Sequence, residues 1–141
     1  LADCVWERFS HDILLRSIKD LLSRSKDARI YMVAGLHTGR STLVHFFRHA
    51  LAIGLCLVPV PPADVWPTCP QETTALPGSE HIMELEVGGT WDEHETPYLT
   101  GQRRPFLLHR GPSDEEDEPI QVRNHWLTVS CMAWAATEAT P

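Results

Sequence analysis

The chain has 141 residues, of which 43% are hydrophobic, and it carries a formal net charge of −7. This length and apolar content are typical of a single globular domain with one core. The sequence contains no run of about 18 apolar residues, so we expect no membrane-spanning helix. The four cysteines (Cys4, Cys56, Cys69 and Cys131) form no C-x-x-C pair, which predicts free thiols in a cytoplasmic protein rather than a zinc site or a disulfide scaffold.

The charges are distributed unevenly along the chain. Residues 1–60 hold eight Lys or Arg against five Asp or Glu, whereas residues 61–141 hold four against fourteen. Such an acidic second half argues against nucleic acid as the main partner. The acidic run Asp114–Glu118 is typical of a solvated loop.

Hydrophobic periodicity predicts an α/β arrangement in the first sixty residues. Apolar positions at helical spacing indicate a helix from an N-cap at Ser10 to about Ser25. The β-branched run Arg29–Ala34 is typical of a strand buried on both faces of a parallel sheet. A second helix is expected over 41–53, ended by Gly54 in a left-handed conformation, before a strand over 55–60.

The later part of the chain is harder to interpret. We expect an irregular insertion at about 61–119, with short strands at 81–87 and 105–109 inside it. The stretch His125–Trp134 has apolar residues at both alternating sets of positions, which predicts a strand deep in a sheet. The whole chain, 1–141, is interpreted as one domain.

The segment GLHTGRST, residues 35–42, follows a strand and precedes a helix, as a phosphate-binding Walker A loop would. A Walker A loop has four residues between its glycines and a lysine after the second one. Here three residues separate Gly35 and Gly39, and Arg40 replaces the lysine. We therefore favour an ordinary strand-to-helix turn, in which both glycines adopt unusual backbone angles and Ser41 or Thr42 caps the helix.

Two other sets of polar residues could carry chemistry. His45 and His49 stand four residues apart on one helix face, a spacing at which two imidazoles can share a metal, although Arg48 lies between them and no glutamate base is present. A solvated helix face is the favoured interpretation, so we predict no metal site. The acidic residues after position 80 could supply a carboxylate pair, but dense acid is usually solvated; they are Glu84, Glu86, Asp92, Glu93 and Glu95.

The ordered set of motifs resembles the second half of a class I S-adenosylmethionine-dependent methyltransferase. The stretches are LADCVWERFSHDILLRSIKDLL, RIYMVAGLHTGRSTLVHFFRHALAIGL and the R-x-x-W-L-x-V pattern of residues 123–129. More narrowly, they are similar to the nicotinamide N-methyltransferase-like group, which includes the family 16 protein-lysine methyltransferases. The resemblance covers about 1–60 and 120–135, and it makes GLHTGRST the turn after the fifth strand of a seven-stranded Rossmann-like sheet.

The resemblance implies roles for a few residues. Asp3 and Trp6 match the D-x-x-Y/W motif that lines the methyl-transfer pocket, and are the expected catalytic residues. Leu1 and Ala2 would lie along the S-adenosylmethionine cofactor. The substrate-side candidates are His11 and His37.

The same resemblance implies that the N-terminal strands of the family, with the glycine-rich loop and the acidic residue that hold the cofactor, are missing from residues 1–141. The main hypothesis is therefore a truncated form of an N-methyltransferase acting on protein lysine or a small nitrogen base, with no membrane partner. The alternative is a non-catalytic α/β interaction module built on the same scaffold. The sequence identifies neither the methyl acceptor nor the oligomeric state.

Overall fold

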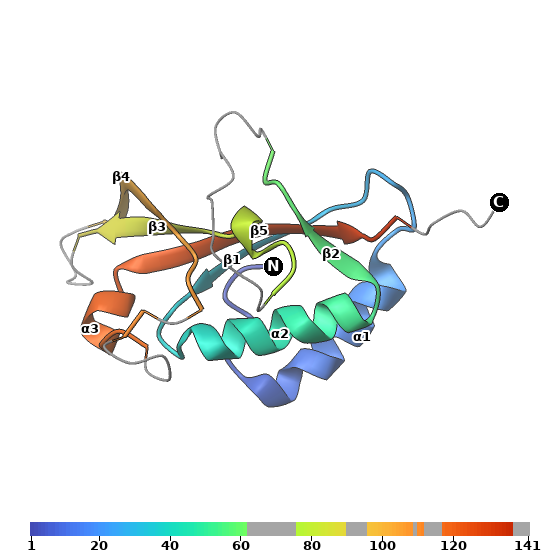
Figure 1. Cartoon of the computed structure of the whole chain (residues 1–141), viewed down its shortest axis with the longest axis horizontal. Helices are drawn as coiled ribbons and strands as arrows, with labels where there is room; N and C mark the ends of the chain where they lie inside the picture. The colour runs from blue at the N-terminus through green and yellow to red at the C-terminus, as the bar shows by residue number, and fades with distance from the viewer. Residues whose placement is uncertain (62–75, 90–95, 109, 112–116, 137–141) are drawn as a thin grey trace.

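The computed structural model describes residues 1–61, 76–89, 96–108, 110–111 and 117–136. Helices and strands alternate in the first half, and strands predominate in the second (Figure 1). In chain order the elements are η1 (Arg8–Ser10), α1 (His11–Leu21), β1 (Ile30–Gly35), α2 (Arg40–Ala52), β2 (Leu55–Val58), η2 (Ser79–His81), β3 (Met83–Gly88), β4 (Tyr98–Pro105), α3 (Ile120–Arg123) and β5 (Trp126–Trp134).

The protein has a mixed α/β fold, and its five strands form one sheet in which β5 is the central strand. β1 pairs with one edge of β5 along its length, from Ile30 opposite Met132 to Gly35 opposite Leu127. The other edge is shared: β2 pairs with the second half of β5 and β3 with the first half, and β4 continues the sheet beyond β3. All of these pairings are antiparallel, so the expectation of a parallel sheet is wrong for the five strands.

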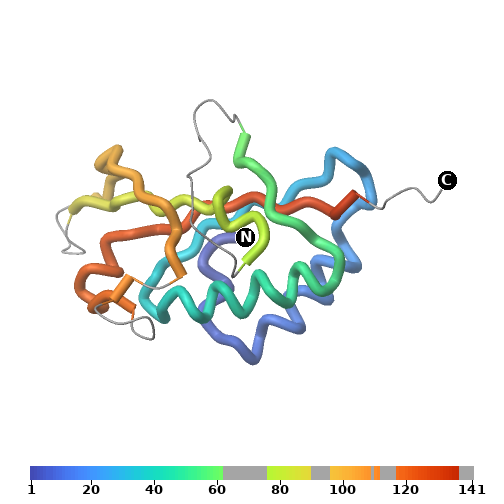
Figure 2. The backbone as a smooth tube through the Cα atoms, viewed as in Figure 1, coloured from blue at the N-terminus to red at the C-terminus, as the bar shows by residue number. Residues whose placement is uncertain are grey.

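A parallel contact does occur at the N-terminal segment. Ala2 forms a parallel bridge with Val33 of β1, and the backbone N–H of Asp3 donates to the carbonyl of Val33 at 2.8 Å. The chain then turns away from the sheet and enters η1 and α1, a path that can be followed in Figure 2. The first three residues therefore extend the sheet beside β1.

Both long helices lie side by side on one face of the sheet (Figure 1). Residues of β1 alternate accordingly: Ile30, Met32 and Ala34 are buried, whereas Tyr31 is 51% exposed and Val33 is 38% exposed. Such an alternation means that one face of the strand is covered. The prediction that this strand is buried on both faces is therefore wrong.

The helix predictions are confirmed in position and corrected at their ends. α1 stops at Leu21, and the hydroxyl of Ser10 donates to the carbonyl of Glu7 instead of capping the helix. α2 ends before Gly54, whose φ of 90° is the left-handed conformation expected after a helix. The buried side chains of both helices build the core with β1 and β5; they include Leu15, Ile18, Leu43, Phe46 and Phe47.

The stretch 61–119 is not merely an irregular insertion, because it supplies β3 and β4 to the sheet. The strand expected at 81–87 is confirmed as Met83–Gly88. The one expected at 105–109 is wrong, since the strand precedes it and ends at Pro105. β4 escaped detection because it is an edge strand with exposed residues from Tyr98 to Arg103, so it lacks an apolar alternation. α3 was not anticipated.

A buried ion-pair cluster fastens these late elements to the start of α2. Arg40 and Glu84 are both fully buried, and the guanidinium donates to the carboxylate through Nε at 2.5 Å and Nη2 at 2.8 Å. Arg104 of β4 donates to the second oxygen of Glu84 at 2.5 Å. Asp117 and Glu118 close the cluster by accepting hydrogen bonds from Arg40. Four separate segments thus meet in one network of charge-assisted hydrogen bonds.

The cluster shifts the pKa values of Arg40 and Glu118 in the direction that preserves their charges. Burial lowers the pKa of Arg40, but the hydrogen bond and charge of Glu84, helped by Glu118 and Asp117, outweigh it and raise this pKa above its ordinary value. Burial raises the pKa of Glu118, yet hydrogen bonds from Arg104 and Arg40 bring it below the ordinary value of a glutamate. Both shifts favour the charged forms of Arg40 and Glu118 at neutral pH.

We predict that Glu84→Gln lowers the free energy of unfolding by about 3–5 kcal/mol, because it leaves the buried guanidinium of Arg40 without its main counter-charge. The matched control is Glu86→Gln on the same strand, where the carboxylate accepts a hydrogen bond from Thr100 near the surface, and where the loss should stay below about 1 kcal/mol. Chemical denaturation of both variants measures the difference. Equal losses would contradict the central role of the buried pair.

Candidate functional site

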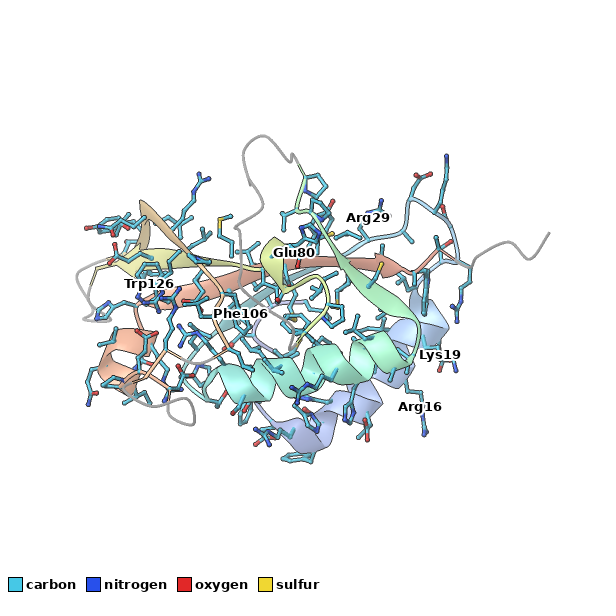
Figure 3. All side chains as sticks on the ribbon, in the orientation of Figure 1. Arg16, Lys19, Arg29, Glu80, Phe106 and Trp126 are labelled. Carbon is cyan, nitrogen blue, oxygen red and sulfur yellow. The ribbon has the colours of Figure 1, made fainter. Side chains whose placement is uncertain are left out.

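A hollow of about 360 Å³ lies at the carboxyl end of β1. It is bounded by the N-terminal segment and by the start of β5, where Trp126 lies. The side chain of Trp126 is labelled in Figure 3. The lining residues are Ala2, Asp3, Val33, Ala34, Gly35, Leu36, His37, Asn124, Trp126 and Leu127.

Asp3 is held at the rim of this hollow by its backbone and by one carboxylate oxygen. Its φ of 45° lies in the left-handed region, which aspartate tolerates better than most residues. The backbone N–H of Gly35 donates to Oδ1 of Asp3 at 3.2 Å. The second oxygen, Oδ2, has no hydrogen-bond partner in the described part of the chain, and so can accept from a ligand.

Gly35 brings the carboxylate of Asp3 and the imidazole of His37 close to each other. A Cβ atom at position 35 would lie 2.9 Å from Nδ1 of His37 and 3.6 Å from Oδ1 of Asp3. The first distance is shorter than a normal Cβ contact, so a side chain at position 35 would displace the imidazole of His37 from this place beside Asp3. Sequence motifs thus predicted two residues, Asp3 and His37, that the fold brings together.

The opposite wall of the hollow is tied to the ion-pair cluster. The guanidinium of Arg104 stacks on the ring of Trp126 at 3.8 Å, a cation–π contact. Arg123 donates from Nη1 to the carbonyl of Leu36 at 2.8 Å and so fixes the turn after β1. Trp126 was recognised only as part of the R-x-x-W-L-x-V pattern, and its place in the hollow follows from the antiparallel pairing of β1 and β5.

The turn in GLHTGRST is built differently from a phosphate cradle. Gly39 has the unusual φ of 86° that was expected, whereas Gly35 needs no positive φ. Arg40 is fully buried against Glu84 and does not reach into the loop. The expected cap by Ser41 or Thr42 is wrong, because a carboxylate oxygen of Asp117 accepts the backbone N–H of Arg40 at 2.7 Å.

The other residues predicted for the methyl-transfer site lie apart from each other. Ala2 lines the hollow at β1, but Leu1 lines a separate groove between α1 and β1. Trp6 is 49% exposed and is not among the residues that line the hollow. His11 is fully buried where α1 meets α2 and is not among the residues that line the hollow, so its role as a substrate-side residue stays a prediction.

The acidic residues also differ from their prediction as solvated side chains. Glu84 is fully buried, and Asp117 and Glu118 of the acidic run bind Arg40. Glu86 bonds Thr100. Residues 92–95 and 114–116 lie outside the described part of the chain.

His11 belongs to a histidine cluster with His45 and His49. Nε2 of His11 lies 2.9 Å from the carbonyl of Val5, which only accepts, so this nitrogen carries the proton and Nδ1 of a neutral His11 accepts from Nδ1–H of His45 at 2.9 Å. The rings of His45 and His49 lie 4.1 Å apart, and Nδ1 of His49 is 2.9 Å from Asp12. Among the described residues, no group of three or more potential ligands is arranged to hold a metal ion.

No family model, curated protein or solved structure matches this chain. The methyltransferase assignment therefore stays a prediction that rests on the residues quoted above. In the residues that the structure covers, no helix combines the length and apolar character needed to cross a bilayer.

The histidine cluster predicts a loss of stability in mild acid. Burial, followed by the charges of His49, His11 and Arg8, lowers the pKa of His45 below its ordinary value. The unfolded chain, in which this histidine titrates near pH 6.5, therefore takes up its proton first as the pH falls. The contribution of His45 to stability is present above pH 6.5 and is lost below it.

We expect the urea midpoint of unfolding to decrease when the pH is lowered from 7.5 to 5.5. This decrease should be smaller for His45→Gln than for the wild type. His125→Gln, at an exposed position, serves as the control and should follow the wild-type profile. A His45→Gln profile as steep as that of the wild type would show that other groups cause the acid sensitivity.

Proposed function

We propose that the chain forms the acceptor side of an S-adenosylmethionine-dependent N-methyltransferase of the nicotinamide or protein-lysine type. The observation that carries this proposal is the parallel contact of Ala2 with Val33, which sets Asp3 beside Gly35 and His37 at one hollow. This is the position at which the resemblance puts the acidic residue of the D-x-x-Y/W motif.

The hollow offers suitable chemistry for a methyl acceptor. Oδ2 of Asp3 can accept a hydrogen bond from an N–H group of the acceptor molecule. This bond would orient the molecule so that its reacting nitrogen faces the methyl donor. Orientation of the reacting atoms is the main contribution that such a site can make. The ring of Trp126 provides an apolar wall against which a flat ring or an aliphatic amine can pack.

The described residues fit an acceptor better than they fit the entire cofactor. A volume of about 360 Å³ is near the lower end of the range of roughly 300–1,000 Å³ for small-molecule pockets. Asp3 is the one carboxylate among the residues lining this hollow in the described structure, and it is engaged with Gly35. No second acidic residue of the described structure lines the hollow to bind the ribose hydroxyls of S-adenosylmethionine, so we assign no catalytic step to these residues.

An interaction module is the second candidate, and the exposed apolar side chains of η1 and α1 favour it. Phe9 is 76% exposed, Ile13 is 70% exposed and Leu21 is 85% exposed. Large apolar side chains gathered on one surface are typical of protein contacts. This role needs neither a cofactor nor the hollow at β1.

Acceptor binding tests the proposal directly. Nicotinamide and butylamine, as probes of the two acceptor types, are titrated into ¹⁵N-labelled protein, and the backbone signals of Gly35 and His37 and the indole signal of Trp126 are followed. We expect these signals to shift with one of the two probes. Shifts confined to α1, or none at all, would favour the interaction module.

Asp3→Asn should weaken binding of the responding probe by about tenfold or more, since a hydrogen bond to a charged group contributes about 1.5–3 kcal/mol. Asp27→Asn, in the exposed segment between α1 and β1, is the matched control and should bind as the wild type does. An unchanged affinity of Asp3→Asn would remove Asp3 from the acceptor site.

A further inference from the structure

A second hollow, of about 480 Å³, lies over the outer face of α2. It shares no lining residue with the hollow at β1, so its role is independent of the proposed methyltransferase function. Basic and imidazole side chains dominate its wall. The lining residues are Arg8, Ser41, Val44, His45, Arg48, His49 and Leu108.

Helical spacing and one hydrogen bond explain why the basic groups converge. Ser41, His45 and His49 follow each other at intervals of four residues, so they share one face of α2, and Arg48 borders that face. Arg8 reaches across from η1, and its Nη2 donates to the hydroxyl of Ser41 at 3.0 Å. Two guanidinium groups therefore flank two imidazoles at one opening.

Within the described part of the chain, the positive charge of this hollow is poorly compensated. Arg48 forms no ion pair with the carboxylates of the described residues, and Arg8 binds a neutral hydroxyl. Asp12 faces the imidazoles, but its Oδ1 is already paired with Nδ1 of His49 at 2.9 Å. Like charges gathered without a counter-ion repel each other, and an anion would relieve that repulsion.

His11 determines which atom of His45 is available. Because buried His11 donates to the carbonyl of Val5, it accepts from Nδ1–H of His45 and holds that ring in one orientation. Nε2 of His45 then has no partner among the described residues. His11 is in this sense a positioning residue, and Nε2 of His45 becomes a donor when the ring is protonated.

We propose that this hollow binds a small organic phosphate monoester, with Arg8 and Arg48 on the phosphate oxygens and Nε2 of His45 as a third donor. Guanidinium groups match phosphate oxygens in pairs, and a monoester carries close to two negative charges at neutral pH. Val44 and Leu108 give the hollow an apolar part that suits the organic body of the ligand. Inorganic phosphate should therefore bind more weakly than an aromatic monoester.

Calorimetric titration with phenyl phosphate, in a buffer of low chloride content, tests the proposal. Phenyl sulfate is the matched probe, with nearly the same shape and a single charge, and should bind at least about tenfold more weakly. Arg48→Gln and Arg8→Gln should each lower the affinity for phenyl phosphate by about tenfold. Arg29→Gln is the control and should leave the affinity unchanged, because Arg29, labelled in Figure 3, lines the separate groove between α1 and β1 and is not among the residues that line this hollow.

Proton uptake provides a second readout that a purely structural role would not change. The groups facing His45 are Arg8 from η1, His11 and Asp12 from α1, and Arg48 and His49 from α2. A bound dianion adds negative charge among them, so the pKa of His45 should rise on addition of phenyl phosphate, as followed by the NMR signal of its Cε1–H.

Three outcomes would overturn the proposal. Phenyl sulfate could bind as tightly as phenyl phosphate, Arg29→Gln could lose as much affinity as Arg48→Gln, or the His45 signal could titrate identically with and without ligand. Asp3→Asn should bind phenyl phosphate as the wild type does, which separates this site from the acceptor hollow. If Asp3→Asn instead lowered the affinity for phenyl phosphate as well as that for the acceptor probe, the loss would indicate a general structural defect and would also count against the assignment.

Discussion

The buried pair of Arg40 and Glu84 is the interaction on which the rest of this fold depends. Removing two charges from water is costly, and the cost is recovered only where each remaining donor and acceptor finds a partner. Arg104, Asp117 and Glu118 complete the network, so the start of α2 is bonded directly to β3 and to the segment before α3, and β4 joins them through Arg104, which donates to Glu84 and Glu118. The same network reaches the hollow at β1, because Arg104 also stacks on Trp126. One ionic cluster therefore determines both the attachment of the late strands and the shape of the candidate acceptor site.

Local patterns in the sequence were sufficient for some elements and insufficient for others. The helices α1 and α2 and the strands β1 and β5 follow from apolar spacing, because each buries its own periodic residues. β4 could not be found in this way, since its residues are mostly exposed and it is held by pairing with β3. Glu84 was misjudged for a related reason: a carboxylate is normally solvated, and only the arrival of Arg40, distant in the sequence, makes its burial possible.

The candidate sites show the same difference between residues that local motifs identify and residues whose placement depends on distant contacts. Asp3 and His37 were identified from motifs, and the fold places both at one hollow because the N-terminal segment pairs with β1. His11 lies apart from that hollow, because its ring is enclosed between α1 and α2, and nothing local in the sequence shows this placement. The phosphate site was not foreseen either. It needs Arg8 to meet Ser41 and Arg48 across two helices, and the spacing of His45 and His49 alone indicated only a shared face.

The central position of β5 has a consequence for how the protein comes to be folded in a cell. β1, β2 and β3 all pair with β5, the latest of the strands in chain order. While the ribosome is still making residues 126–134, β1 and β2 lack their strand partner and β3 can pair only with β4, so edges of these strands are open to other nascent chains. The complete sheet must therefore wait until β5 has emerged from the exit tunnel, although α1, α2 and the pairing of β3 with β4 can form earlier. Synthesis at about 5–20 residues per second leaves these edges unpaired for several seconds, an interval in which chaperone binding would be most valuable.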